Sequence, residues 1–250
     1  MTSPSTPPAS NSASAAAGPT SPCSKNEPAM TILMFDIDGT LSLSQGAGTL
    51  AMTRTFKELW GISNALEGMN FAGRSDSWIV PTALANQGRD CSPEDLARFI
   101  DHYVPQLDRA LPRRRSRLCP GVSELLDVLS RLTVTVGLGT GNFRRAAEAK
   151  LAPLGVWDYF IDGGFGDDHP DRTELLAAGL ERLRQHADDG SDVVVIGDTA
   201  HDIEAGHAIG ARVVAVRTGY SEPGDLDEAD VTLDDLSDLQ ESLAALLGVA

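Results

Sequence analysis

The stretch Asp36-Ile37-Asp38-Gly39-Thr40 directly follows the apolar run Thr31-Ile32-Leu33-Met34-Phe35. A short, continuous apolar run is typical of a strand that is buried on both faces of a parallel sheet. The carboxylates of Asp36 and Asp38 are therefore expected just beyond the end of a buried strand. Such a pair can hold a divalent cation and can divide the roles of nucleophile and acid/base. The competing interpretation is a tight hairpin turn, which Asp-Gly between apolar runs often marks.

Further β-rich apolar runs predict the rest of the sheet. They lie at residues 133–138, 193–196 and 212–216, with a weaker run at 159–161. Helical patterns lie between and after them, at about 121–131, 143–154, 171–187, 201–208 and 235–247. This alternation predicts an α/β fold, a Rossmann-like parallel sheet core with helices on both faces. In that architecture, ligands bind beyond the carboxyl ends of the strands.

One interval breaks the alternation. Residues 47–112 contain three helical patterns and no strand pattern, at 47–60, 75–87 and 93–109. We interpret this interval as an inserted α-helical cap domain, with the α/β core formed by residues 29–46 and 113–250. Residues 1–28 are rich in Pro, Ser, Ala and Thr, a composition that buries little apolar surface, and are predicted to be a disordered tail.

The composition restricts the partners. The formal charge is −16, with 36 acidic residues against 20 Lys and Arg, so a duplex nucleic-acid surface is not an expected partner. The apolar stretches are too short to cross a bilayer, so no membrane partner is expected either. Three widely spaced cysteines favour a reducing, cytoplasmic location. The oligomeric state is left open by the sequence.

A second polar cluster, Gly137-Leu138-Gly139-Thr140-Gly141-Asn142, closes the next strand along the chain and opens a helix. The hydroxyl of Thr140 stands at the strand end, and the free N–H groups of a helix start lie just beyond it. Asn142 is a candidate N-cap of that helix. The stretch can form an anion cradle, although Gly and Asn are also common in ordinary turns.

Two more clusters follow later strands. Arg172 is expected in the first turn of a helix, where the helix dipole disfavours a cation, so its placement predicts a partner such as a phosphoryl oxygen. Asp198 follows the clearest buried strand, and Asp202 lies four residues further on the same helix face. Two carboxylates that face one point repel each other unless something positive lies between them. Because parallel strands end at one edge, we expect Asp36, Thr140, Arg172 and Asp198 to meet around one pocket.

These motifs resemble those of the haloacid dehalogenase-like hydrolase superfamily, in particular its phosphatases with a helical cap. The resemblance covers about residues 30–247 and implies a Mg²⁺-dependent hydrolysis of a small phosphorylated metabolite through an aspartyl-phosphate. It implies Asp36 as nucleophile and Asp38 as general acid/base, with Thr140 and Arg172 as further catalytic groups. The implied substrate-binding residues are Thr140, Gly141, Asn142 and Arg172, and the implied Mg²⁺ residues are Asp36, Asp38, Asp198 and Asp202.

The chain departs from the family pattern in one motif, which usually carries a lysine. The only lysines are Lys25, Lys57 and Lys150. Lys150 falls inside the helix after the second strand, so we expect it to lie away from the site. Arg172 is therefore assigned to that motif, since it stays charged and can grip two oxygens at once.

Other functions remain open from the residues. A hexose-phosphate mutase of the same superfamily would keep the same carboxylates. A non-enzymatic phospho-acceptor or binding module would use similar acidic, hydroxyl and basic groups, although receivers of that kind lack a helical insert. Residues 46–51 fit the dinucleotide pattern G-x-G-x-x-A, but they do not directly follow a strand.

Overall fold

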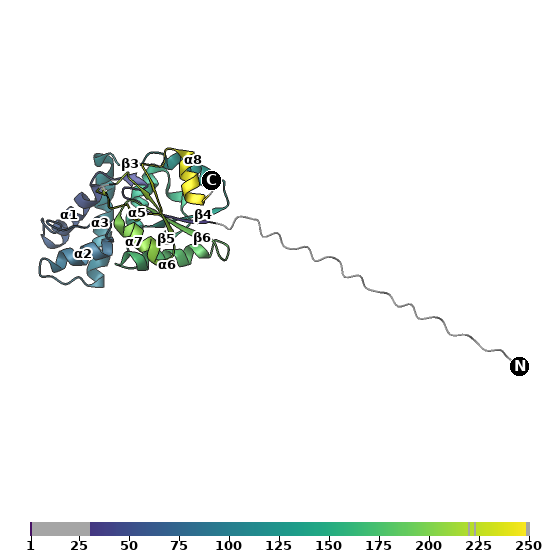
Figure 1. Cartoon of the computed structure of the whole chain (residues 1–250). Coiled ribbons are helices and arrows are strands. Elements are labelled where there is room, and N and C mark those ends of the chain that lie inside the picture. Colours follow the sequence, from purple (N-terminus) through teal and green to yellow (C-terminus); the bar gives the residue numbers. More distant parts are fainter. Residues whose placement is uncertain (2–30, 220, 223, 249–250) are drawn as a thin grey trace.

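The computed structural model describes Met1 and residues 31–219, 221–222 and 224–248 (Figure 1). Apart from Met1, the predicted tail at residues 1–28 lies outside the described residues. Among the helices of the described part, none is both long and apolar enough to cross a bilayer.

The core of the fold is a six-stranded sheet in the order β5-β4-β1-β6-β7-β8, in which every neighbouring pair is parallel. Its strands are β1 (Thr31–Phe35), β4 (Val134–Gly139), β5 (Gly163–Gly164), β6 (Asp192–Gly197), β7 (Arg212–Val216) and β8 (Val231–Leu233). A separate antiparallel pair joins β2 (Ser42–Leu43) to β3 (Arg117–Leu118). The predicted α/β class and parallel sheet are confirmed.

The continuous apolar runs predicted the bounds of their strands accurately, whereas the weaker run at 159–161 did not. Strands β1 and β7 have the predicted bounds, and β4 and β6 differ by one residue at either end. The strand predicted at 159–161 is wrong, because that segment overlaps the 3₁₀ helix η2 (Trp157–Tyr159) and the strand follows at β5. Strand β5 consists of two glycines, since a Cβ on Gly164 would lie 2.0 Å from the carbonyl oxygen of Leu175. The close packing of the helix that contains Leu175 thus excludes a side chain at Gly164, and β5 lacks the apolar residues that mark a strand in a sequence.

Helices cover both faces of the sheet (Figure 1). Helices that contribute to the core on one face are α4 (Val122–Leu129), α5 (Arg144–Leu151) and α8 (Leu239–Leu247). Those on the other face are α6 (Arg172–Arg184) and α7 (Ala200–Ala208). A short 3₁₀ helix, η1 (Ala152–Leu154), continues α5. All the predicted core helices are present, most of them shorter than predicted.

Strand β1 shows why the sheet needs helices on both sides. Its five residues are all buried, and they alternate between the two cores. Leu33 and Phe35 belong to the core with α4, α5 and α8, while Ile32 and Met34 belong to the core with α6 and α7. This is the alternation of side chains along a strand, and it places β1 at the centre of the fold.

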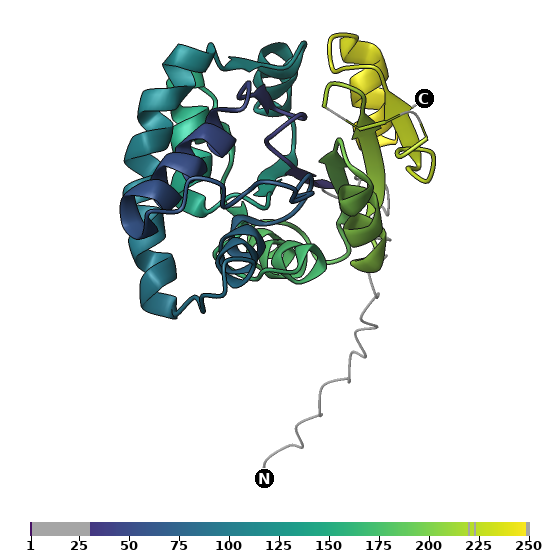
Figure 2. The same cartoon turned by 90° about the vertical axis from the view of Figure 1, so that its left-hand side faces the viewer.

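Three helices, α1 (Ala47–Trp60), α2 (Asp76–Ala85) and α3 (Pro93–Arg114), form a helical unit with its own apolar core. Figure 1 shows the three helices together at one end of the molecule, and Figure 2 shows α1 beside α3 on the side opposite α8. Helix α3 begins with a capping box between Ser92 and Asp95 and has Pro93 in its first turn, which are strong start signals. The unit contacts the sheet side through α5, which contributes Phe143 and Ala146 to the same apolar core. The exact domain boundaries, 47 and 112, stay a prediction.

The close approach of α6 to β5 makes a testable prediction. A Cβ on Gly179 would lie 2.2 Å from the backbone nitrogen of Gly164. Gly179→Ala should therefore lower the free energy of unfolding by about 1 to 3 kcal/mol, although alanine is normally the better helix former. The measurement is urea unfolding followed by circular dichroism. Gly48→Ala in α1 is the matched control, because its nearest contact, the Tyr103 hydroxyl, would be at an ordinary 3.5 Å. Equal effects of both changes would contradict the packing argument.

Candidate active site

The topology brings the four predicted clusters together. Strands β4 and β6 flank β1 on its two sides, with Phe35 paired to Leu138 and to Ile196. The residues that follow these strands therefore emerge at one edge of the sheet. Strand β5 lies next to β4, so the loop after it leads Arg172 to the same edge. The expected convergence of Asp36, Arg172 and Asp198 is confirmed by their contacts, described next.

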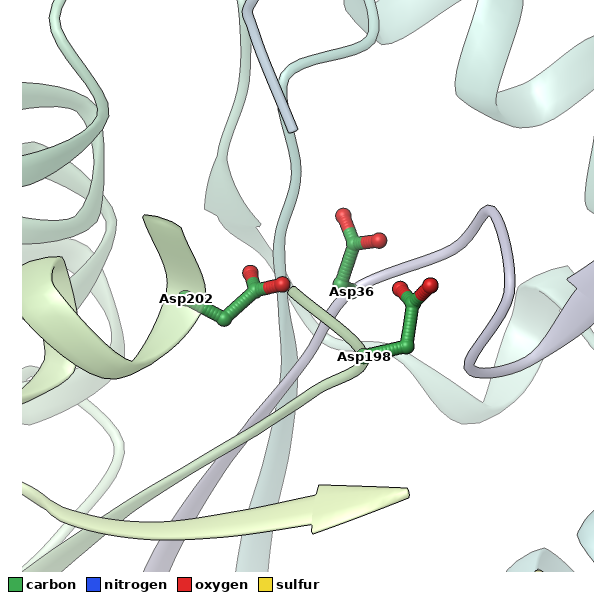
Figure 3. A group of neighbouring side chains, drawn as sticks. All are labelled: Asp36, Asp198 and Asp202. Carbon is green, nitrogen blue, oxygen red and sulfur yellow. The ribbon is translucent and has the colours of Figure 1, made fainter. Parts of the chain in front are cut away.

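Three carboxylates form a compact acidic cluster at this edge (Figure 3). Asp36, Asp198 and Asp202 each offer an oxygen within 4.8 Å of the others, and all three residues are buried. Burial, together with the neighbouring charges of Asp202 and Asp36, raises the pKa of Asp198 to about 9. Burial likewise raises the pKa of Asp36 to about 6, with Arg172 opposing the rise. The cluster thus concentrates more negative charge than its immediate partners neutralise.

Arg172 is the cation inside this cluster. Its Nη2 donates to Asp36 Oδ1 at 2.9 Å, to the carbonyl oxygen of Gly139 at 3.1 Å, and to Asp202 Oδ1. The side chain is only 9% exposed, and its Nε has no hydrogen-bond partner among the described residues. Arg172 is the first residue of α6, as predicted, and these acidic partners account for a cation at a helix start.

Asp198 and Asp202 are held by local structure. Asp202 Oδ2 accepts hydrogen bonds from the backbone N–H of Thr199 at 3.0 Å and from its hydroxyl at 2.6 Å, so it closes a capping box at the start of α7. The Asp198 carboxylate lies against Gly39, where a Cβ would be 2.2 Å from its Oδ2. Gly39 also has a φ of 90°, which disfavours any other residue at this position. The Asp-Gly pair is therefore a turn and part of the site at once.

The carboxylate of Asp38 belongs to a second charge group. Its Oδ2 accepts hydrogen bonds from Lys150 Nζ and, at 2.9 Å, from Asn142 Nδ2, while its Oδ1 accepts one from Ser44 Oγ at 3.2 Å. Burial raises the pKa of Asp38, but the Lys150 ammonium and these hydrogen bonds outweigh it, so the pKa lies below the ordinary 3.8. Asp38 was also assigned to the metal, but its carboxylate is not part of the acidic cluster.

The expectation that Lys150 lies away from the site is wrong. Lys150 is 4% exposed, and its Nζ contacts Asp38 and lies 2.5 Å from Asn142 Oδ1. Helical side chains point toward the helix N-terminus, so a long lysine two turns into α5 reaches back to the strand end. The buried face of α5 is otherwise made of Ala146, Ala147 and Leu151. A lysine on this apolar face was the signal in the sequence that could have revealed it.

The second cluster is arranged differently from the prediction. The N-cap of α5 is Phe143, and Asn142 uses its side chain to hold Asp38 and Lys150. The Thr140 hydroxyl is fully buried and accepts from the backbone N and Nδ2 of Asn142, at 3.3 and 2.9 Å. Gly141 and Asn142 line the cavity described below, whereas Thr140 does not.

The helical unit contacts the core through the start of α2. Ser75 Oγ donates to the carbonyl oxygen of Pro170 at 2.6 Å, and the N–H of Asp76 donates to the carbonyl oxygen of Gly141 at 2.7 Å. In return, Asp76 Oδ2 accepts from the N–H of Phe143 at 2.9 Å. Ser75 and Asp76 belong to the polar stretch Gly73-Arg74-Ser75-Asp76. Arg74 itself is exposed and stacks 4.9 Å from the ring centre of Trp78.

A cavity of about 710 Å³ lies between the helical unit and the sheet edge. The core contributes Asp36, Asp38, Lys150 and Arg172 to its wall, and the helical unit contributes Met52, Ile79 and Tyr103. The space is large enough for a small metabolite, and the helical unit adds the charged residues Arg74 and Asp76 to its otherwise mostly apolar and polar wall.

Known proteins share these features. A profile of the haloacid dehalogenase-like hydrolases matches residues 30–210. The chain is 30% identical over 203 residues to the phosphoglycolate phosphatase of Rhodospirillum rubrum, which covers 76% of this chain and 80% of that protein. It is 25% identical over 224 residues to the phosphoglycolate phosphatase of Agrobacterium fabrum, covering 87% and 94%. The structure of CbbY from Rhodobacter sphaeroides in complex with phosphate has the same fold, with a TM-score of 0.67, 19% identity and coverage of 87% and 99%.

The chain therefore belongs to the haloacid dehalogenase-like hydrolase family, and it is a phosphatase of that family. The resemblance inferred from the motifs is confirmed.

Asp76 predicts a pH dependence of stability. Burial raises its pKa to about 7, against the opposing effects of Lys150 and the Phe143 N–H. The folded state then binds a proton that the unfolded chain has already lost, so this residue lowers the free energy of unfolding as the pH rises from about 4 to 7. Asp76→Asn keeps an oxygen for the Phe143 N–H but cannot ionise. The variant should gain stability relative to the wild type between pH 5 and pH 8, by at most about 3 kcal/mol.

The measurement is urea unfolding at both pH values in the presence of a chelator. Asp90→Asn, at an exposed position of the same helical unit, should differ from the wild type equally at both. A pH-independent effect of Asp76→Asn would show that its ionisation does not contribute.

Proposed function

We propose that this phosphatase hydrolyses a small phosphomonoester in two steps, through an aspartyl-phosphate on Asp36, and that it requires Mg²⁺. The observation that carries the proposal is the position of Asp36. Its carboxylate lines the cavity, contacts Arg172 on one side, and lies in the acidic cluster with Asp198 on the other. A nucleophile that attacks a phosphate dianion needs positive charge around it, which Arg172 and a metal ion held by the acidic cluster would supply.

The donor set suits a hard divalent cation. Mg²⁺ prefers carboxylate oxygens, and the cluster offers three carboxylates within 4.8 Å of one another. Asp36 and Asp198 would hold the ion. Asp202 would contribute less freely, because both its oxygens already accept hydrogen bonds from Arg172 and Thr199. When bound, the cation offsets repulsion between the carboxylates and the substrate phosphate.

The chain's own groups account for the proton and phosphoryl transfers. In the first step an oxygen of Asp36 bonds to phosphorus, the bond from phosphorus to the substrate alcohol breaks, and Asp38 gives a proton to the leaving oxygen. Asp38 must take up this proton beforehand, because its lowered pKa leaves it ionised in the free enzyme. In the second step Asp38 takes a proton from water, whose oxygen bonds to phosphorus. The bond to Asp36 then breaks, which releases inorganic phosphate, frees the Asp36 carboxylate and leaves on Asp38 the proton taken from water.

Arg172, Gly141 and Asn142 are the proposed contacts of the phosphoryl oxygens. Gly141 and Asn142 line the cavity at the start of the loop into α5. Arg172 keeps a buried Nε without a partner among the described residues, so it has a donor to spare. The role of Thr140 would then be indirect, since its hydroxyl holds Asn142.

The relatives support a small phosphorylated substrate. Two of them are named phosphoglycolate phosphatases. A variant of CbbY was solved with xylulose-(1,5)bisphosphate. The cavity volume of about 710 Å³ is compatible with molecules of this size.

Removing the nucleophile should abolish turnover. Asp36→Asn should lower kcat for 4-nitrophenyl phosphate by roughly 10³-fold or more, because the amide is a poor nucleophile. Phosphate release at saturating Mg²⁺ is the measurement, with Asp90→Asn as a surface control that keeps wild-type activity. Full activity of Asp36→Asn would refute the nucleophile assignment.

Metal binding should be visible without turnover. Mg²⁺ at about 100 times its Kd should stabilise the wild type by about 2.7 kcal/mol, seen as a rise in Tm by differential scanning calorimetry. At one fixed Mg²⁺ concentration, the rise in Tm should be smaller at pH 6 than at pH 8, because protons compete with Mg²⁺ for carboxylates whose pKa is raised. Asp198→Asn should lose the rise and Asp90→Asn should keep it. An unchanged response of Asp198→Asn would exclude this residue as a ligand.

A further inference from the structure

We propose that Lys150 is the positioning residue of the general acid/base: together with Asn142 it fixes one oxygen of Asp38, so that the other oxygen is presented to the leaving group and to water. This inference rests on the proposed function and deepens it. It adds a second cation to a site in which the sequence motifs account for only one.

The burial of Lys150 is hard to explain by packing alone. A lysine is almost never fully buried unless its charge is paired, because removing the ammonium from water costs several kcal/mol. Lys150 is 4% exposed, on a face of α5 that otherwise packs with Ala146, Ala147 and Leu151. An apolar residue would serve the fold at this position. The charge must therefore serve its partners, and those partners are Asp38 and Asn142.

The hydrogen bonds distinguish the two oxygens of Asp38. Oδ2 accepts from both Lys150 and Asn142, and Asn142 is itself fixed by the Thr140 hydroxyl at 2.9 Å. From the part of the chain that the structure describes, Oδ1 accepts only the longer hydrogen bond of Ser44, at 3.2 Å. The Asp38 side chain is 40% exposed toward the cavity side of the site, whereas that of Lys150 is 5% exposed. The buried lysine thus holds the inner oxygen, and Oδ1 is left to exchange the proton.

Lys150 and Arg172 pair with different carboxylates. Arg172 contacts Asp36 and Asp202, and Lys150 contacts Asp38. No described residue bridges the two ion-pair groups with a hydrogen bond. Loss of Lys150 should therefore disturb proton transfer while leaving the nucleophile and its phosphate contacts in place. This separation makes the role testable.

The test compares two substrates that differ by one nitro group. The 4-nitrophenolate ion leaves without a proton, whereas phenolate, a stronger base, gains more from the general acid. Lys150→Met keeps the length of the side chain and removes the charge. It should lower kcat/KM for phenyl phosphate about 10- to 100-fold and change kcat/KM for 4-nitrophenyl phosphate by less than about threefold, since kcat/KM for this ester reports the first step only.

The second step gives an independent readout. Asp38 must also take a proton from water, so kcat of Lys150→Met should fall even for 4-nitrophenyl phosphate. Stopped-flow measurement should then show a burst of 4-nitrophenolate close to the enzyme concentration. Asp38→Asn should give the same leaving-group bias, and the double variant should be no slower than Asp38→Asn alone, because the two residues act as a unit. Lys150→Arg, which keeps the charge in a different shape, should recover part of the loss.

The control is Arg145→Met on the same helix, whose exposed ion pair with Asp101 lies outside the site. It should match the wild type on both esters. Equal losses on the two esters, no loss at all, or additive losses in the double variant would each overturn the inference. Should Lys150→Met not fold, as judged by circular dichroism, Lys150→Arg decides alone: a leaving-group bias supports the role and a uniform loss overturns it. A wild type that cleaves neither ester would instead refute the proposed function, on which the inference rests.

Discussion

Burial of like charge at one edge of a parallel sheet is the constraint on which the rest of this structure depends. The register of β1 with β4 and β6 places the first residues after three strands next to one another. Where those residues are aspartates, they must either give up their charge or acquire cations. The raised pKa values of Asp36 and Asp198 are the direct sign of this cost. The cations and hydrogen bonds around these aspartates offset the cost of burying their charge.

Cations from distant parts of the chain offset the cost of burying these carboxylates. Arg172 comes from the start of α6 and Lys150 from inside α5. Four carboxylates in the two groups face these two cations, so the site stays negative when all of them are ionised. A chain with a net charge of −16 would otherwise repel an anionic substrate. A divalent cation in the acidic cluster would restore the balance where the phosphate binds.

Much of the fold could be predicted from the sequence, because its central strands are buried on both faces. Continuous apolar runs such as Thr31–Phe35 therefore marked them well. The failures have physical reasons. Strand β5 consists of two glycines, because a side chain at Gly163 would meet the backbone of β4 and one at Gly164 would meet the backbone of α6. The apolar run at 159–161 therefore predicts the strand in the wrong place. Such close tertiary packing cannot be inferred from the local amino-acid composition.

The motifs of the site could be predicted, whereas several of the hydrogen bonds and ion pairs within it could not. Asp36, Arg172 and Asp198 follow strand ends, so topology alone brings them together. Lys150 and the side chain of Asn142 could not be placed in the same way. Their roles depend on the direction in which a helical side chain points and on a competition between capping a helix and holding a carboxylate. Tertiary contacts, which the local sequence does not contain, decide between these two uses of the Asn142 side chain.

The junction between the helical unit and the sheet edge has a consequence for how such enzymes diversify. At the start of α2, each hydrogen bond to the core ends on a main-chain group: the carbonyl oxygens of Pro170 and Gly141 and the N–H of Phe143. Main-chain groups survive changes of side chain. These hydrogen bonds at the start of α2 are thus insulated from side-chain mutation on the core side, whereas the apolar contacts through Phe143 and Ala146 are not. A fold joined in this way can explore new metabolites while its reaction centre stays unchanged.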